Sequence, residues 1–315
     1  MAHSVLGLHH VTATVEDAQD DLNFSVATLG QRLVKRTVNF DNPGVFHFYY
    51  GNERGTPGTI WTTFPYKDQG VRSGIKGHGQ VTATAFSVPA RSIDTWSDRL
   101  TARGIHVERA ATRFGDDVIR FSDSSGLTFE LVSSADDDRT PWVREDLDAS
   151  TAIRGLHSVT LTVPSPQETL PFLKRFLGVE TIDQAGGRIR VGTGSNAPGR
   201  VIDLVSPSDA PPAINGIGTV HHVAFAVSTS EEQLAIRRDL VGVGWRVTEV
   251  RDRQYFQSIY FREPGGVLLE VATVLPGFAI DEPVGSLGEA LKLPPWEEPY
   301  RPRIEAQLPR IATPI

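Results

Sequence analysis

Four segments of the chain begin with apolar and polar residues in alternation, a pattern typical of half-buried β-strands. They read "GLHHVTATV" (7–15), "GHGQVTATAFSV" (77–88), "GLHSVTLTV" (155–163) and "TVHHVAFAV" (219–227). Each is followed by a polar stretch compatible with a helix, as in residues 91–104 and 165–178, and then by short strand-like runs broken by glycine and proline. The chain therefore repeats one unit four times: a strand, a helix and about three further strands.

Four such βαβββ units predict an α+β fold, in which two units close a curved mixed sheet and the helices lie outside. The second and fourth units also match at their ends, because residues 113–131 align with residues 253–271 at a constant offset of 140 positions (253 minus 113). This alignment pairs Glu130 with Glu270 and Arg113 with Arg253.

A change in composition separates the units into two pairs. Residues 135–152 are polar, charged and without periodicity, so we interpret them as a linker between an N-terminal domain (1–134) and a C-terminal domain (153–275) of two units each. Residues 276–315 contain eight prolines and cannot form regular secondary structure throughout. We interpret them as a proline-rich arm, whose Leu, Trp and Tyr residues favour packing on the body over a disordered tail.

Alternation assigns the side chains of each first strand to two faces. In residues 7–15, Val11 and Ala13 should pack under the helix, while His10 and Thr12 should face the concave interior. The aligned position is expected to face the interior in every unit, and it is occupied by His10, Gln80, Ser158 and His222 in turn. Among these four side chains only the two histidines are strong metal ligands.

Acidic residues late in the units complete the candidate site. Glu130 and Glu270 hold this place in the second and fourth units, and the third unit offers Asp203. Pairing consecutive units leaves each cleft with one histidine at most and weak partners. Pairing the first unit with the fourth unites His10, His222 and Glu270, the two-histidine, one-carboxylate triad that leaves positions open on iron(II). The sequence therefore predicts a crossed pairing, with the second and third units forming a metal-free cleft.

Composition narrows the classes of function. The 315 residues carry a net charge of −7, so no basic surface suggests nucleic acid or anionic lipid as a partner. Cysteine is absent, which leaves only nitrogen and oxygen ligands for a metal. The N-terminus lacks the pattern of a signal peptide and no apolar run is long enough to span a membrane, so we expect a cytoplasmic protein. We also expect the protein to assemble as a homo-oligomer, as many soluble proteins do.

Several longer motifs carry a resemblance to a known family. They are "LHHVT" (8–12), "GQRLVKRTVNFD" (30–41), "FHFYYGNERGTPGTIWTTFP" (46–65), "TRFG" (112–115), "HHVAFAV" (221–227) and "PGGVLLEVAT" (264–273). With its paired units, the chain resembles the vicinal oxygen chelate superfamily of glyoxalases, bleomycin-resistance proteins and extradiol dioxygenases. Within it, the chain is similar to the ring-cleaving dioxygenases that act on hydroquinones and chlorohydroquinones.

The resemblance implies roles for individual residues. His10, His222 and Glu270 would be the iron ligands, in agreement with the alternation of the strands. Tyr260 and Arg253 match a tyrosine and an arginine of the site, and Thr12 and His221 match positions beside the ligands. Alternation instead turns His221 away from the metal, as it does His9, so the resemblance requires a strand bulge or twist at these histidines. His47 and His157 are expected to be structural.

The resemblance, together with the candidate ligands, implies an iron(II)-dependent dioxygenase that opens hydroquinone-type aromatic rings, chlorinated or alkylated ones included, in aromatic degradation. Its partners would be a small aromatic substrate and O2. Manganese(II) suits the same ligands, whereas zinc has no redox change with which to activate dioxygen. Three alternatives stay open: a glyoxalase-type lyase or isomerase with zinc or nickel, a catechol extradiol dioxygenase, and a non-enzymatic small-molecule binding protein.

Overall fold

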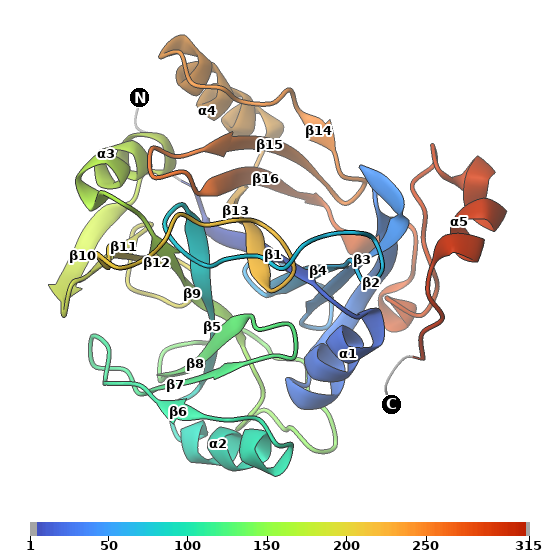
Figure 1. Ribbon diagram of the computed structural model, residues 1–315, viewed down its shortest axis with the longest axis horizontal. Helices are drawn as coiled ribbons and strands as arrows, with labels where there is room; N and C mark the ends of the chain where they lie inside the picture. The colour runs from blue at the N-terminus through green and yellow to red at the C-terminus, as the bar shows by residue number, and fades with distance from the viewer. Residues whose placement is uncertain (1–4, 313–315) are drawn as a thin grey trace.

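The computed structural model describes residues 5–312, in which two eight-stranded mixed sheets carry their helices on the outside (Figure 1). The first unit comprises β1 (Gly7–Val15), α1 (Ala18–Leu22), a π-helical turn η1 (Asn23–Thr28), β2 (Arg32–Asn39), β3 (Asn42–Gly51) and β4 (Ile60–Pro65). The second comprises β5 (Gln80–Pro89), α2 (Ile93–Ala102), β6 (Glu108–Arg109), β7 (Val118–Ser122) and β8 (Thr128–Ser134).

The other two units repeat the same order of elements. The third comprises β9 (Gly155–Thr162), α3 (Pro166–Leu177), β10 (Glu180–Ala185), β11 (Arg188–Gly192) and β12 (Val201–Val205). The fourth comprises β13 (Thr219–Val227), α4 (Ser230–Gly242), β14 (Arg251–Asp252), β15 (Phe256–Arg262) and β16 (Leu268–Pro276). The predicted α+β fold of four βαβββ units is confirmed, and the predicted linker, residues 135–152, contains no helix or strand.

The sheets join units from opposite ends of the chain. One sheet has the strand order β14-β15-β16-β13-β1-β4-β3-β2 and thus combines the first and fourth units. The other has the order β10-β11-β12-β9-β5-β8-β7-β6 and combines the second and third. The central seams are the antiparallel pairs β1–β13 and β5–β9. The structural halves therefore follow the predicted crossed pairing and not the order of the units along the chain.

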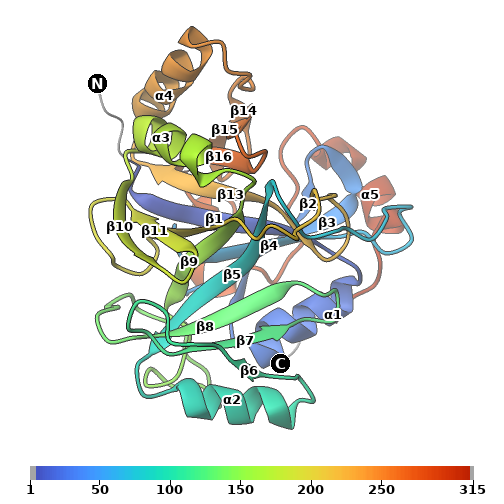
Figure 2. The same ribbon diagram turned by 60° about the vertical axis from the view of Figure 1, so that its left-hand side comes forward.

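Apolar side chains account for how the layers pack. Helix α2 buries Ile93, Trp96 and Leu100 from one face, as an amphipathic helix does. Between the sheets, the Trp61 ring of β4 lies 5.1 Å from that of Phe129 in β8, so both sheets share one core. Figure 2 shows α3 and α4 side by side on one end of the molecule and α2 on the opposite end.

The C-terminal arm packs on the outer strands β2 and β3, which Figure 1 shows beside it. It consists of η2 (Phe278–Ile280), η3 (Val284–Ser286), η4 (Glu298–Tyr300) and α5 (Arg301–Gln307). Leu293 and Ile304 bury themselves against Val38, and the buried ammonium of Lys35 lies between the carboxylates of Asp281 and Glu282. The described part of the arm, up to residue 312, thus packs on the body as expected. Residues 313–315 of the arm, and residues 1–4 at the other end of the chain, lie outside the described residues.

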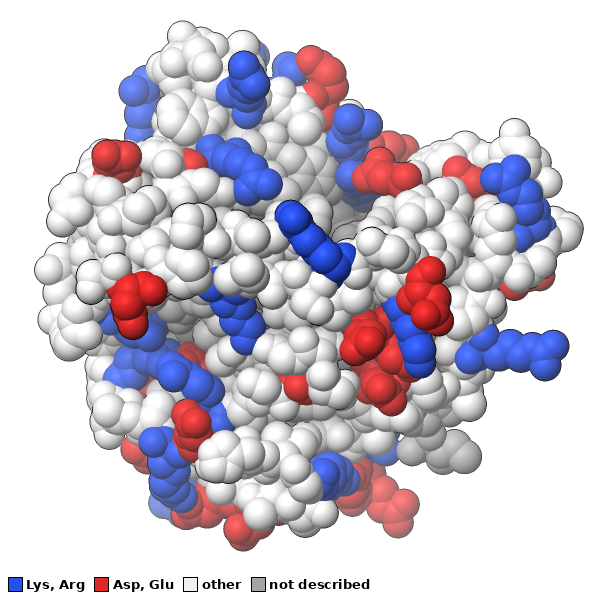
Figure 3. All heavy atoms as spheres, viewed as in Figure 1, with Lys and Arg blue, Asp and Glu red and all other residues white. Residues whose placement is uncertain are grey.

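Charges of both signs are interspersed on the face seen in Figure 3, without a large field of one sign. Within residues 5–312, no helix has the length and apolarity needed to cross a bilayer.

The Lys35 ion pairs generate a prediction about stability. Lys35→Ala leaves two acidic side chains without their buried cation, so the free energy of unfolding should fall by about 3 kcal/mol, measured by chemical denaturation. Lys67→Ala is the matched control, because Lys67 pairs with Asp17 on the surface and its loss should change little. Equal effects of the two substitutions would contradict the role of Lys35 in holding the arm.

Candidate metal centre and substrate cavity

The pairing of β1 with β13 brings three ligand-type side chains together. In the β1–β13 ladder Thr12 lies opposite His222 and His10 opposite Ala224, and in the β13–β16 ladder Ala224 lies beside Glu270. The Nε2 atoms of His10 and His222 are 3.3 Å apart, and Glu270 Oε2 lies 3.3 Å from the former and 2.8 Å from the latter. The three predicted ligands therefore converge, although they come from opposite ends of the chain.

The spacing of these atoms fits a single metal ion. Three ligands about 2.1 Å from an ion and at right angles to one another would lie about 3.0 Å apart. Ser258 donates a hydrogen bond to Glu270 Oε1, whereas the buried Oε2 has no hydrogen-bond donor. The fully buried carboxylate would have a raised pKa through desolvation, but the charges of His10 and His222 outweigh this and hold the pKa of Glu270 well below its usual range. An anionic oxygen thus points at two imidazoles, which makes this cluster a candidate metal centre.

Two β-bulges resolve the position of the neighbouring histidines. The β1–β13 register passes from Leu8 directly to His10, which leaves His9 as the extra residue of a bulge, and His221 is likewise skipped on β13. Each bulged histidine turns toward its neighbour, with Nδ1–Nδ1 distances of 2.9 Å for His9 and His10 and 2.8 Å for His221 and His222. The bulge that the resemblance required is therefore present at both positions.

These contacts define the hydrogen-bonding state of the candidate ligands. When Nε2 of His10 or His222 offers its lone pair to a metal, Nδ1 carries the proton and donates it to the bulged neighbour. Burial, followed by the charge of His10, lowers the pKa of His9 to about 3, and burial with the charge of His222 does the same for His221. Both bulged histidines are therefore neutral acceptors at neutral pH, and they fix the orientation of the two ligand rings.

A cavity of about 310 Å³ opens beside the three ligands. It is lined by His10, Asn39, Phe40, Asp41, His47, Tyr49, Phe64, Tyr66, His221, His222, Arg253, Phe256, Tyr260 and Leu268. Its volume is close to the lower limit of typical ligand pockets, about 300 Å³, and so suits one aromatic ring. Most of its walls are aromatic, with polar groups at separate places.

Arg253 and Tyr260 form a polar pair in this cavity. Arg253 Nε donates to Tyr260 Oη at 3.1 Å, and its Nη2 lies 3.0 Å from Asp41 Oδ2. Tyr260 is the cross-strand neighbour of Glu270. Burial, followed by the charge of Glu270, raises the pKa of Tyr260, so its hydroxyl keeps its proton. Asp41 and Tyr260 outweigh the effect of burial and raise the pKa of Arg253, which therefore stays cationic.

Thr12 lies beside the candidate ligand His222 but does not line the cavity: it is fully buried opposite His222 and accepts a hydrogen bond from Thr62 at 2.9 Å. His47, which we expected to be structural, does line the cavity and contacts Thr62 through Nε2 at 2.8 Å. Alternation in β3 offered a signal, since His47 and Tyr49 share the face opposite Phe48.

Sequence reasoning also missed other cavity residues. Asn39, Asp41 and Tyr66 were not singled out, yet Asn39 Nδ2 donates to Tyr66 Oη at 3.0 Å within the cavity wall. Ser258, which orients Glu270, was missed as well. No local pattern marks these residues, because they come together only through the packing of β2, β4 and β15.

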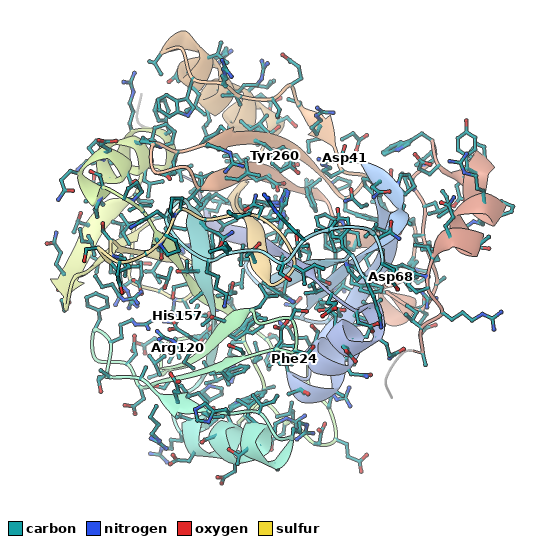
Figure 4. The ribbon with its side chains drawn as sticks, in the orientation of Figure 1. Phe24, Asp41, Asp68, Arg120, His157 and Tyr260 are labelled. Atoms are coloured by element: carbon teal, nitrogen blue, oxygen red, sulfur yellow. The ribbon has the colours of Figure 1, made fainter. Side chains whose placement is uncertain are left out.

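The second sheet contains a counterpart of this centre. There, arginines bind the carboxylate of Glu130, which corresponds to the candidate ligand Glu270. Glu130 pairs with Arg120 across β7–β8 as Glu270 pairs with Tyr260, and Arg113 binds both oxygens of Glu130 at 2.6 and 2.8 Å. Desolvation would raise the pKa of Glu130, but the two arginines outweigh it and lower the pKa to about 2. Figure 4 shows Arg120 in this second half and Tyr260 in the other.

The registers correct one alignment made from the sequence. Gln80 was expected at the position of His222, but Ala83 faces Thr160 across β5–β9 as His222 faces Thr12 across β1–β13. The reason is a bulge at Thr82, which reverses the alternation between Gln80 and Ala83.

The third unit contributes two more residues to the counterpart. His157 occupies the bulge that corresponds to His9, and its Nδ1 lies 3.0 Å from Ser158 Oγ. Asp203 binds the buried Arg190, with Oδ1 2.8 Å from Nε. In this half, alanine and serine thus stand at the places of the candidate ligands His222 and His10, and arginines bind the carboxylates of Glu130 and Asp203.

Comparison with known proteins places the chain in a family. The model of the Glyoxalase/Bleomycin resistance protein/Dioxygenase superfamily matches residues 7–131 and 155–271. The chain therefore belongs to this superfamily.

Individual relatives span nearly the whole chain. The chain is 40% identical over 309 residues to MhqO of Bacillus subtilis (strain 168), whose name gives ring-cleaving dioxygenase as a proposed activity, with 98% of this chain and 97% of that protein covered. It is 36% identical to the chlorohydroquinone/hydroquinone 1,2-dioxygenase of Sphingobium indicum, with 93% of each chain covered. A crystal structure from Bacillus subtilis, described as a proposed dioxygenase, superposes with a TM-score of 0.94 at 39% identity and 99% coverage of both chains.

The contrast between the two halves predicts one metal ion per chain. Glu270→Gln removes the anionic ligand, so the metal content should fall from about one ion per chain to a small fraction of that, measured by atomic emission after metal loading and gel filtration. Glu130→Gln is the matched control and should retain about one ion, because Glu130 binds arginines.

The control has its own expected effect, on acid stability. The lowered pKa of Glu130 means that its contribution to stability is complete above pH 4.5 and is lost as the pH falls toward about 2. Glu130→Gln should remove this part of the pH dependence. Loss of metal from Glu130→Gln, or its retention by Glu270→Gln, would contradict the assignment of the centre.

Proposed function

We propose that this chain is an iron(II)-dependent dioxygenase that opens the ring of hydroquinone-type aromatic compounds with O2. The observation that carries the proposal is the convergence of His10, His222 and Glu270 on one point in the wall of a cavity of single-ring size. The likeness to the chlorohydroquinone/hydroquinone 1,2-dioxygenase over 93% of both chains supports the substrate class. Iron(II) held by the triad would supply the redox change that lets dioxygen react with a ring, with manganese(II) as the alternative ion.

The cavity supports a substrate with hydroxyls at opposite ends of its ring. One hydroxyl would lie at the three ligands, and the amide of Asn39 with the hydroxyl of Tyr66 offers hydrogen bonds to the other. The aromatic rings of Phe256, Tyr49 and Phe64 provide apolar walls for the ring itself. A catechol carries both hydroxyls on adjacent carbons. With these at the three ligands, it would offer no hydroxyl to the Asn39–Tyr66 pair.

Tyr260 and Arg253 are suited to handle charge and protons on the reacting oxygen. Tyr260 accepts a hydrogen bond from Arg253, so its own proton is available to an oxygen in the cavity. The cationic Arg253 stabilises negative charge that develops on the substrate or on the carboxylate that ring opening produces. His221 and Thr12 serve as positioning residues: His221 fixes the ring of His222, and Thr12 packs beneath it.

The glyoxalase-type isomerase would use zinc or nickel, usually with four protein ligands. The cluster found within residues 5–312 contains three. This difference favours the dioxygenase.

The first test is consumption of dioxygen by protein loaded anaerobically with iron(II). Hydroquinone should consume about one O2 per ring opened, and mass spectrometry with isotopically labelled dioxygen should find both atoms in the product. Catechol should react at least about tenfold more slowly, since it lacks the distal hydroxyl. Reaction with catechol alone would overturn the substrate class, and no uptake with either compound would overturn the proposed activity.

Tyr260→Phe tests the proton donor. The turnover number should fall about 10²-fold, while metal content and the KM for hydroquinone change little, because the substitution removes only the hydroxyl. Tyr66→Phe is the matched control: it removes the same atom from the same cavity and should raise the KM with kcat preserved. If both variants lost kcat equally, Tyr260 would have no special role.

A further inference from the structure

A second cavity of about 300 Å³ lies next to the substrate cavity and is called the back cavity below. It is lined by His9, Arg54, Gly55, Thr56, Pro57, Ile60, Tyr255, Phe256, Val274, Leu275, Pro276, Gly277, Phe278, Ala279 and Val284. Phe256 is the one lining residue that it shares with the substrate cavity among those described. The start of the C-terminal arm forms part of its wall, with Phe278 buried and Ala279 exposed at the rim.

Two rings, those of Phe256 and His9, lie between this back cavity and the proposed ligand His10. The Phe256 ring lies 4.9 Å from the ring of His9 and 5.2 Å from that of His10. A register irregularity between Phe256 and Ser258, at the beginning of β15, gives Phe256 this place between the two cavities. Phe256 is therefore the side chain at which the back cavity meets the substrate cavity.

The chemistry of the walls selects the occupant. Aliphatic and aromatic side chains form most of the lining. The polar Arg54 and Thr56 are exposed at the rim, and the polar atoms of His9 and Tyr255 already bind His10 and Asp281. Burying the two hydroxyls of a hydroquinone there would leave them without partners, which costs free energy. A small apolar molecule has no such cost, and apolar cavities in proteins do take up xenon and benzene. Dioxygen has this character.

We propose that the back cavity is the route by which dioxygen reaches the metal centre, with Phe256 as the partition. This inference depends on the function proposed above, in which the aromatic substrate occupies the front cavity and obstructs it. A separate apolar route lets the second substrate arrive after the first has bound. It also keeps the polar groups of the front cavity free to hold the aromatic substrate.

Xenon tests the cavity without reference to activity. Crystals of the iron-loaded protein pressurised with xenon should show the gas among Ile60, Val274 and Phe278. Ala279→Trp places an indole at the rim and should abolish this site, as should Val274→Phe from β16. Ile280→Trp is the matched control, because Ile280 is the next residue, is exposed and does not line the cavity. Absence of xenon from the cavity of the unaltered protein would overturn the proposal.

Kinetics tests the route itself. Ala279→Trp and Val274→Phe should raise the KM for dioxygen about fivefold or more, with kcat at saturating dioxygen and the KM for hydroquinone unchanged, whereas Ile280→Trp should behave like the unaltered enzyme. Loss of xenon with an unaltered KM for dioxygen would overturn the route while the proposed function stands. Xenon in the cavity of a protein that consumes no dioxygen would instead overturn the proposed function, and the delivery role with it.

Discussion

The antiparallel pairing of β1 with β13 is the constraint on which the site depends. It is a contact between strands more than two hundred residues apart, and its register sets His222 opposite Thr12, two pairs along the ladder from His10. A slip of one residue would turn either imidazole to the other face of the sheet. The parallel neighbour β16 then supplies Glu270 beside Ala224. The three candidate ligands therefore lie on the innermost strands, where hydrogen bonds on both sides hold each backbone.

The same scaffold appears twice, and the difference between its copies shows what the side chains decide. Both seams carry bulges at equivalent places, so the backbone around His9 is repeated around His157. In one copy two imidazoles meet a carboxylate that has an orphaned oxygen; in the other, Arg113 saturates the carboxylate of Glu130. The guanidinium of an arginine neutralises the carboxylate at all ordinary pH values and offers five N–H donors. Unlike a metal ion, it cannot bind an additional ligand by coordination. The second copy therefore fills with a guanidinium the carboxylate position that the first copy leaves without a donor.

Ligand chemistry made much of the candidate centre predictable from the sequence. The alternation of apolar and polar residues within a unit does not show which other unit it pairs with. The crossed pairing was predicted because only the first and fourth units together supply His10, His222 and Glu270. Alternation failed at the bulges, because an extra residue reverses the faces beyond it; Ala83 stands where Gln80 was expected. In β3 it sets His47 and Tyr49 on one face, but it could not tell whether that face meets solvent or a cavity, because this depends on how the sheet curves.

The C-terminal arm links distant parts of the chain to the mouth of the cavity. Trp296 packs edge-on against Phe40 with ring centroids 5.6 Å apart, and Phe40 is part of the cavity wall. The turn that follows Phe40 carries Asp41, which holds Arg253 across the opening. Phe40 thus contacts the arm and lines the cavity, and the residue after it binds the cavity arginine. The arm therefore supports one wall of the cavity through Phe40, although none of its described residues, 276–312, lines that cavity itself.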